Sequence, residues 1–342
     1  MKYVANARAW WAFFLLALLP LGCTRSFIVA VGPNQDVSIF SDFPVGDARL
    51  DLLRGILTRK VETPVRPESP FHVERADSNS FSSRRSWRNL AFLGDMTSHA
   101  WVARRCRQVV GEDRVRKLTA SPAGYTFIRD AWADGQTILF VHAASRKALA
   151  DLFEREGESL VQRFGSLVIE GLKETLFLSG EHTVLADGIY QRHGYRIRIP
   201  KDFLVEEQTE NRFVRIKRVV PDEPVMFLFI YYQEHKAPSL NPNLCMAIRD
   251  TLAAVYFGHD RIEPSRTTVK HCRFLGRDAF EIYGLYQNLD PPMGGPFKMF
   301  CFLEDGRLYL IDLAVFNPPG DKTPQMRILE AVARTFETDQ SL

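Results

Sequence analysis

Apolar residues follow two periods along the chain, and these periods predict two successive groups of strands and helices. Unbroken or alternating apolar runs are typical of strands, whereas steps of three and four residues indicate helices. The first group ends in a long helix predicted over 145–177, roughly 50 Å in length at 1.5 Å per residue. Its other predicted elements are strands at 27–32, 71–73 and 89–94 and a helix at 46–57.

Each group ends with the same arrangement, in which an Asp-Gly pair joins two apolar strands and a helix follows. Asp134-Gly135 precedes the apolar strand 137–143, and Asp305-Gly306 separates two apolar runs near the end of the chain. Asp-Gly favours a hairpin because tight turns require the positive φ that glycine adopts. The repeated order indicates either a duplicated architecture or the chance recurrence of a common hairpin.

The second group contains more strands than the first. The stretch "YRIRIP" (195–200) alternates apolar and polar residues, as a half-buried strand does. Further strands are predicted at 213–220, 225–233, 267–274 and 278–286, and helices at 244–257 and 324–336.

The two groups predict an α+β fold with two domains, each an antiparallel sheet with helices packed on one face. The predicted domains cover 27–180 and 195–338, with a linker at 181–194. The chain length agrees with two domains.

The first 22 residues have the layout of a lipoprotein signal peptide. Lys2 and Arg8 precede an apolar core at 10–21, which is too short to span a membrane comfortably. Gly22 supplies the small residue that signal cleavage before a lipidated cysteine requires, so Cys23 is the predicted lipidation site. Pro20 occupies the position where such signals usually carry leucine. The alternatives are an uncleaved anchor and an ordinary cleaved signal.

Lipidation would attach the protein to a membrane through a short tether, residues 23–26. Because Thr24 follows the cysteine, the aspartate that would favour inner-membrane retention is absent. We therefore expect a cell-envelope lipoprotein that faces the periplasm or the surface, in the outer membrane.

The charge balance excludes a general affinity for nucleic acid. The formal net charge is +3, and it falls to +1 when residues 1–22, with two basic and no acidic residues, are removed. A near-neutral chain has no global field for a polyanion. The expected partners are the membrane, through Cys23, and another envelope protein.

Four cysteines follow the signal, at positions 106, 245, 272 and 301. None belongs to a CxxC pair or to a Cys/His zinc pattern, so no metal is expected. An oxidising compartment permits a disulfide, and four cysteines allow three pairings between which the sequence does not choose. Cys301, in an apolar run, instead favours buried free thiols.

Catalytic motifs are absent from the sequence, and no cofactor is expected. His99, between Asp95 and Trp101, is a weak candidate for a base or a ligand. A second weak group consists of His271, Asp278 and Glu281, although charged residues on an outer strand face explain it equally well. The neighbours His271 and Cys272 cannot form a dyad on a strand, because their side chains point to opposite faces.

The stretch Met293-Gly294-Gly295-Pro296-Phe297 is the candidate binding loop. Two glycines before a proline permit backbone conformations, and a close approach by a partner, that other residues exclude. The alternative is a structural loop that leads into an edge strand.

Three stretches carry a resemblance to a known family: residues 129–154, 249–257 and 293–336, the last beginning "MGGPFKMFCFLEDGRLYLIDLAVF". They resemble the domain-of-unknown-function family numbered 4837, a family of envelope lipoproteins found mainly in Bacteroidetes. The similarity covers about 27–336 and implies location and architecture, with no site to carry over. The second half is also loosely similar to a PsbP-like α+β domain, which does not determine function.

Three functions remain open. The first is a non-enzymatic, lipid-anchored module that binds another envelope component. The second is a hydrolase of an envelope polymer, with carboxylates and His99 or His271 in its site. The third is a carrier of an apolar small molecule, which needs a cavity near 227–233.

Overall fold

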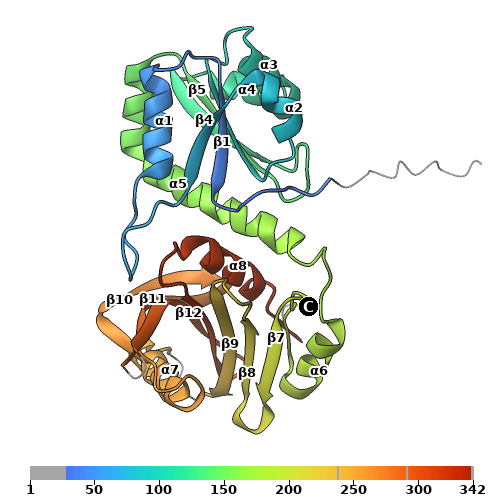
Figure 1. Ribbon diagram of the computed structural model, residues 1–342, viewed down its shortest axis with the longest axis vertical. Helices are drawn as coiled ribbons and strands as arrows, with labels where there is room; N and C mark the ends of the chain where they lie inside the picture. Colours follow the sequence, from blue (N-terminus) through green and yellow to red (C-terminus); the bar gives the residue numbers. More distant parts are fainter. Residues whose placement is uncertain (1–27, 237–238, 290–291, 340–342) are drawn as a thin grey trace, which may run out of the picture.

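The computed structural model describes residues 28–236, 239–289 and 292–339. The predicted signal peptide and Cys23 with its tether therefore lie outside the described residues. The described chain forms two sheet domains that lie one above the other along the long axis, and helix α5 (Arg146–Thr175) runs from the side of the first sheet into the space between them (Figure 1). Among the described residues, no helix combines the length and the apolar character that crossing a membrane requires.

The first domain is a five-stranded sheet in the order β2-β1-β3-β5-β4. Neighbouring strands run parallel except for β4, which pairs antiparallel with β5. Its elements are β1 (Asp36–Ser41), α1 (Ala48–Thr58), β2 (His72–Ala76), α2 (Phe81–Arg84), β3 (Asn89–Gly94), α3 (Trp101–Val110), α4 (Glu112–Leu118), β4 (Ala123–Arg129), β5 (Thr137–Ala143) and α5 (Arg146–Thr175).

Helices cover both faces of this sheet. Residues of α1 and α5 form one core with the sheet, and residues of α2, α3 and α4 form another on the opposite face. The prediction of an antiparallel sheet with helices on one face was therefore wrong for this domain. Every residue of β3 and β5 is buried, which is typical of strands in a parallel sheet covered on both sides.

The hairpin and the long helix of the first domain are confirmed. Strands β4 and β5 pair antiparallel on either side of the Asp134-Gly135 turn, and Gly135 has a φ of 78°. Helix α5 is capped by the Ser145 hydroxyl. The predicted strand at 27–32 is wrong, because among its described residues only Val29 and Val31 make isolated bridges and the first strand begins at Asp36.

The second domain is a seven-stranded antiparallel sheet in the order β10-β11-β12-β13-β9-β8-β7, as the prediction of an antiparallel sheet required. Its elements are α6 (Thr183–His193), β6 (Tyr195–Arg196), β7 (Leu204–Gln208), β8 (Phe213–Arg218), β9 (Val225–Glu234), α7 (Pro242–Tyr256), β10 (Arg261–Phe274), β11 (Arg277–Leu289), β12 (Pro292–Glu304), β13 (Arg307–Phe316), α8 (Thr323–Ala333) and β14 (Glu337–Thr338).

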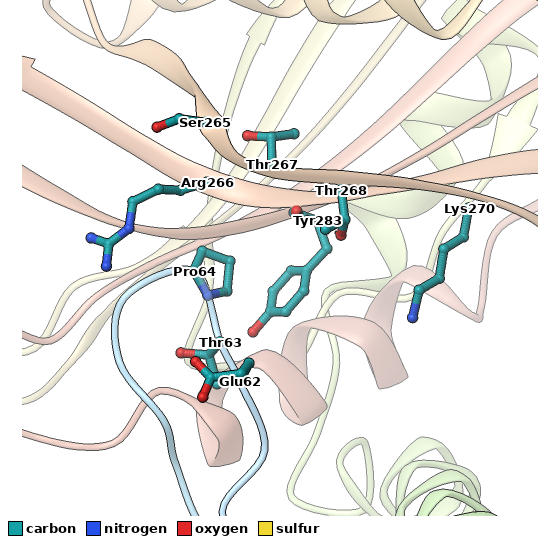
Figure 2. Close-up of a pocket in the computed structure, with 9 residues that line it drawn as sticks. All are labelled: Glu62, Thr63, Pro64, Ser265, Arg266, Thr267, Thr268, Lys270 and Tyr283. Atoms are coloured by element: carbon teal, nitrogen blue, oxygen red, sulfur yellow. Dashed lines mark hydrogen bonds between the residues drawn. The ribbon is translucent and has the colours of Figure 1, made fainter.

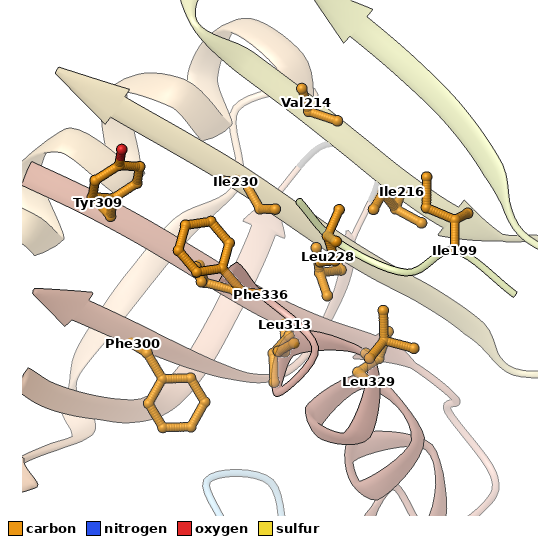
Figure 3. Close-up of a cluster of buried hydrophobic side chains, with 14 of the residues drawn as sticks. Ile199, Val214, Ile216, Leu228, Ile230, Phe300, Tyr309, Leu313, Leu329 and Phe336 are labelled. Atoms are coloured by element: carbon orange, nitrogen blue, oxygen red, sulfur yellow. The ribbon is translucent and has the colours of Figure 1, made fainter. Parts of the chain in front are cut away.

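Helices lie on both faces of this sheet as well. The larger core packs α8 and α6 on one face, and Figure 3 shows Leu228, Ile230 and Leu313 of the sheet beside Leu329 of α8. The smaller cores on the other face include Cys245 and Leu252 of α7. The α+β class is thus confirmed, whereas the placement of helices on one face was wrong.

Strand β9 contributes to the cores on both faces. Leu228 and Ile230 belong to the α8 side, and Phe229 belongs to the α7 side. All three side chains are buried. The apolar stretch 227–233 therefore reflects a central strand packed on both sides, and not the wall of a carrier cavity.

The predicted linker at 181–194 contains a helix. Helix α6 occupies most of it, and its Ile189 packs in the core of the second domain. Gly194, in a left-handed conformation, ends the helix. The two sheets also differ in strand direction and order, so the interpretation of a duplicated architecture is wrong and only the closing hairpins are shared.

Candidate functional site

A carboxylate from the first domain holds the start of a helix from the second. The Glu68 side chain is buried and accepts hydrogen bonds from the backbone N–H of Lys322 (3.0 Å) and Thr323 (3.0 Å) and from the Thr323 hydroxyl (2.8 Å). Helix α8 has no cap from its own N-cap side chain. Glu68 therefore satisfies N–H groups that would otherwise lack partners, and its charge suits the positive end of the helix dipole.

A second contact between the domains is made by Arg327 of α8. Its buried guanidinium donates to the carbonyl oxygens of Asn34 (3.1 Å) and Pro70 (2.9 Å) and lies 4.5 Å from the centre of the Phe71 ring. Ala331, also on α8, belongs to the core of the first domain. The two domains thus share buried polar and apolar contacts and position each other.

A groove of about 390 Å³ lies between the domains, here called the interdomain groove (Figure 2). Domain interfaces are common places for binding sites. The first domain contributes the loop before Glu68, and the second contributes the middle of edge strand β10 and one side chain of β11. The lining residues are Glu62, Thr63, Pro64, Ser265, Arg266, Thr267, Thr268, Lys270 and Tyr283.

An irregularity in β10 shapes the groove. The pairing of β10 with β11 shifts between Glu263 and Thr268, so the intervening residues leave the regular ladder. Pro264 has no N–H to donate there, and the Thr267 hydroxyl bonds to the Glu263 carbonyl at 2.8 Å. Bulges of this kind redirect side chains at the edge of a sheet. This one presents hydroxyl and basic side chains toward the loop of the first domain.

The side chains of the groove suit a polar ligand. Burial raises the pKa of Tyr283 to about 12, so its hydroxyl stays protonated and available as a donor at neutral pH. Arg266 and Lys270 add cationic donors, and Glu62 adds a carboxylate. Hydroxyl, cationic and acidic groups together can bind hydroxyl-rich or charged segments, and they offer little to an apolar molecule.

Lys298, whose ammonium lies near the Tyr283 ring, is neutralised by two carboxylates of the protein. The ammonium of Lys298 lies 2.9 Å from a Glu330 oxygen and 3.8 Å from a Glu281 oxygen. Burial alone would lower the pKa of Lys298, but the two carboxylates outweigh it and raise the pKa. Lys298 is therefore held as a structural cation at the domain boundary.

The predicted binding loop at Met293–Phe297 is not a loop. These residues begin β12, a strand in the interior of the sheet, and Phe297 is fully buried. A side chain on Gly295 would overlap the Val315 carbonyl, and one on Gly294 would meet the Tyr286 carbonyl at 2.5 Å. The glycines therefore allow close approach between strands of the same sheet, and the loop on which the binding hypothesis relied is absent.

The weak catalytic candidates are dispersed. His99 is exposed, while the Asp95 carboxylate accepts bonds from the Thr97 backbone and hydroxyl. His271 and Asp278 come within 4.0 Å of each other, but both are largely exposed. Glu281 instead faces Lys298.

The structure brings together a pair that sequence reasoning missed. Asp95 directly follows β3, and His142 lies next to the last residue of β5, the parallel neighbour of β3. An Asp95 oxygen lies 3.7 Å from His142 Nδ1. Ligands of open parallel sheets often bind at this edge. His142 is buried, which lowers its pKa, and its Nδ1 accepts the Met96 backbone N–H at 3.1 Å. This neutral histidine supports the loop after β3.

Metal-ligating side chains do not gather in threes anywhere in the described part of the chain. All four cysteines that the structure describes are free. Cys245 of α7 and Cys301 of β12 are fully buried in one cluster, and each thiol affects the pKa of the other. The Cys245 thiol raises the pKa of Cys301 further beyond the effect of its burial.

A buried polar network lies beneath α7. Arg249 donates to the Asp312 carboxylate at 2.7 Å, and both side chains are almost completely buried. Asp260 is close by, and its Oδ1 has no hydrogen-bond partner among the described residues. Burial, together with the Asp312 charge, outweighs the effects of Arg249 and Asn288 and raises the pKa of Asp260 to about 6.

Because of Asp260, the free energy of unfolding should rise as the pH falls from about 6 toward 4. The pKa of about 6 in the folded state exceeds the ordinary aspartate pKa of 3.8, so the folded state binds more protons than the unfolded state between these pH values. Asp260→Asn should therefore stabilise the protein by about 3 kcal/mol at pH 7, and the difference should vanish near pH 4. Urea unfolding of both forms across this range measures it, and a constant difference would contradict the assignment.

Comparison with known proteins gives one family match and several distant structural similarities. Among curated proteins, nothing matched. Similar solved structures include the PsbP protein of Synechocystis sp. PCC 6803, with 14% identity over 43% of this chain and 88% of that one and a TM-score of 0.30. A protein of Bacteroides thetaiotaomicron VPI-5482 has 13% identity over 42% of this chain and 45% of that one, with a TM-score of 0.27.

A third similar structure is LpqN of Mycobacterium tuberculosis, described as involved in cell envelope biogenesis. It has 11% identity over 40% of this chain and 78% of that one, with a TM-score of 0.25. Residues 182–335, which include α6 and the seven-stranded sheet, match the model of the family described as Domain of unknown function (DUF4837). The match confirms the resemblance to this domain-of-unknown-function family over the second domain, a shorter stretch than the 27–336 that the resemblance covered.

Proposed function

We propose that the protein is a lipid-anchored component of the cell envelope that binds a polar partner in its interdomain groove. The observation that carries the proposal is the groove itself, which is lined by both domains. The buried contacts of Glu68 and Arg327 hold these domains together. A site built from two domains that hold each other is preorganised, so little is lost in ordering it when a partner binds.

The groove favours binding over catalysis. Its hydroxyl and basic side chains can hold a polar segment, and neither His99 nor His271 is among the residues that line it. The carrier function has less support, because the apolar stretch in β9 is filled on both faces by core side chains. We therefore propose a non-enzymatic binding module.

The sequence supports the anchor through its short apolar core and the Gly22-Cys23 pair. Replacing Cys23 with alanine should move the protein out of the membrane fraction, because the acyl chains that hold it would no longer be attached. Cell fractionation with metabolic labelling by a fatty acid measures both effects. Membrane retention without lipid would contradict the anchor, though not the groove.

Reversing one charge in the groove should abolish partner binding. The experiment is in-cell crosslinking of a tagged full-length protein, followed by mass spectrometry of the captured component. Arg266→Glu should remove the component, while Arg273→Glu, on the same strand outside the groove, should retain it. Equal capture by both variants would show that the groove is not the binding site.

A further inference from the structure

A second pocket lies on a different part of the molecule, where the described chain begins. It has a volume of about 660 Å³ and is here called the tether-side pocket. Its lining comes from the end of α5, the turn that follows it, the loop before β3 and the loop before β7. The residues are Arg88, Leu172, Thr175, Leu176, Ser179, Gly180, Lys201 and Asp202.

Arg88 joins this pocket to the first described residues. Its guanidinium donates to the Ala30 carbonyl at 3.1 Å and to the Thr175 hydroxyl at 3.2 Å. The backbone N–H of Ala30 bonds to the Asp134 carbonyl, and the adjacent Gly135 packs against Gly171 of α5. The chain that leads from Cys23 therefore enters the fold beside the C-terminal end of α5.

The two cations of the pocket lack acidic partners. Across the described residues, no carboxylate lies within ion-pairing distance of Arg88 or Lys201, and Asp202 is paired with Arg218. Burial alone lowers the pKa of Arg88. A half-buried guanidinium without a counter-charge is unfavourable unless a bound anion balances its charge.

Exposed apolar side chains surround the same region. Ile28 is 43% exposed, Val31 52%, Leu178 61% and Val184 82%. Single exposed apolar residues are ordinary, but these four lie in the entering segment and in the short stretch from the end of α5 to the start of α6. In Figure 1 the end of α5 and helix α6 lie on the side opposite to β10, which lines the interdomain groove.

We propose that the tether-side pocket binds the phosphate group of a membrane phospholipid, with the surrounding apolar side chains against the bilayer. The inference rests on the proposed anchor at Cys23. Five residue steps separate Cys23 from Ile28, so the entry point lies at most about 18 Å from the lipidated cysteine. Arg88 and Lys201 can bind a phosphate, and the partly buried Leu176 can contact an adjoining acyl chain. This orientation turns the interdomain groove away from the membrane.

The test places a fluorescent label on either side of the full-length lipidated protein in vesicles. One form carries Leu178→Cys, the other carries Val255→Cys on α7, and both carry Cys272→Ser to remove the partly exposed native thiol. Vesicles of phosphatidylcholine, with or without phosphatidylglycerol, contain a lipid that bears a quencher on its headgroup. Quenching at position 178 should be several-fold stronger than at position 255.

Lys201→Glu should weaken the quenching at position 178, most on phosphatidylglycerol vesicles, whereas Arg273→Glu should leave it unchanged. Equal quenching at both positions in vesicle-bound protein would overturn the inference and leave the anchor intact. Protein missing from the vesicle fraction would overturn the anchor and the inference together. Thermal stabilisation of Cys23→Ala by inorganic phosphate, without quenching at 178 in the lipidated form, would assign the pocket to a free anion and overturn the lipid.

Discussion

Replacing Glu68 with alanine should lower the free energy of unfolding by about 3–5 kcal/mol. Three donors at the start of α8, the N–H groups of Lys322 and Thr323 and the Thr323 hydroxyl, would lose their acceptor in a buried place. Unsatisfied buried donors are unfavourable because water cannot replace the missing partner. Urea unfolding measures the effect, and loss of the link between the domains should appear as a less cooperative transition.

Two variants of the same loop serve as controls for this result. Glu68→Gln keeps one acceptor oxygen, so it should lose only about 1–2 kcal/mol. Glu62→Ala removes an exposed carboxylate of the groove and should change stability by less than about 0.5 kcal/mol. If Glu68→Ala proved as mild as Glu62→Ala, Glu68 would not hold the two domains together.

Removing one partner of the Arg249–Asp312 pair should be equally damaging. Asp312→Ala would leave the Arg249 guanidinium buried beneath α7 without its carboxylate, and a loss of about 3–5 kcal/mol is expected. The double variant Arg249→Met, Asp312→Leu should recover most of this loss, because it removes both charges and keeps an apolar volume.

A double-mutant cycle measured by urea unfolding separates the pair from its surroundings. Arg249 also lies over the Phe297 ring at 4.1 Å, so Arg249→Met alone should retain part of the packing. Additive losses in the double variant would show that the two side chains do not stabilise each other.

Local patterns predicted local structure well. Strand β5 has the predicted bounds, α5 lies within one or two residues of its predicted ends, and both Asp-Gly pairs join antiparallel strands. These elements are specified by neighbouring residues, namely a turn pair between apolar runs or apolar residues at helical steps. Sequence alone was sufficient for them.

Strand direction could not be predicted in the same way. A buried apolar run such as β3 suits a parallel or an antiparallel sheet, and the choice depends on where the connecting helices pack. Residues Met293–Phe297 were wrongly predicted to form a loop for a related reason. Glycines that allow close packing between strands give a sequence that resembles a loop. The family match adds that residues 182–335 form a recognisable unit, although it assigns no activity to it.

The candidate sites depend on contacts between distant segments. Thr63 and Thr268 line the same groove although about two hundred residues separate them, and neither belongs to a motif. His142 meets Asp95 only because β3 and β5 are neighbours in the sheet. Edge strand β10 has a bulge, and Pro264 is the one local sign of it in the sequence.

The most direct test of the account is photocrosslinking in cells from both walls of the interdomain groove. A photoreactive residue at position 63 samples the first domain, one at position 268 samples the second, and one at Val255 on α7 is the reference. The account predicts that positions 63 and 268 capture the same envelope component and that position 255 does not. Capture from one wall only, or equal capture at position 255, would contradict a binding site shared by the two domains.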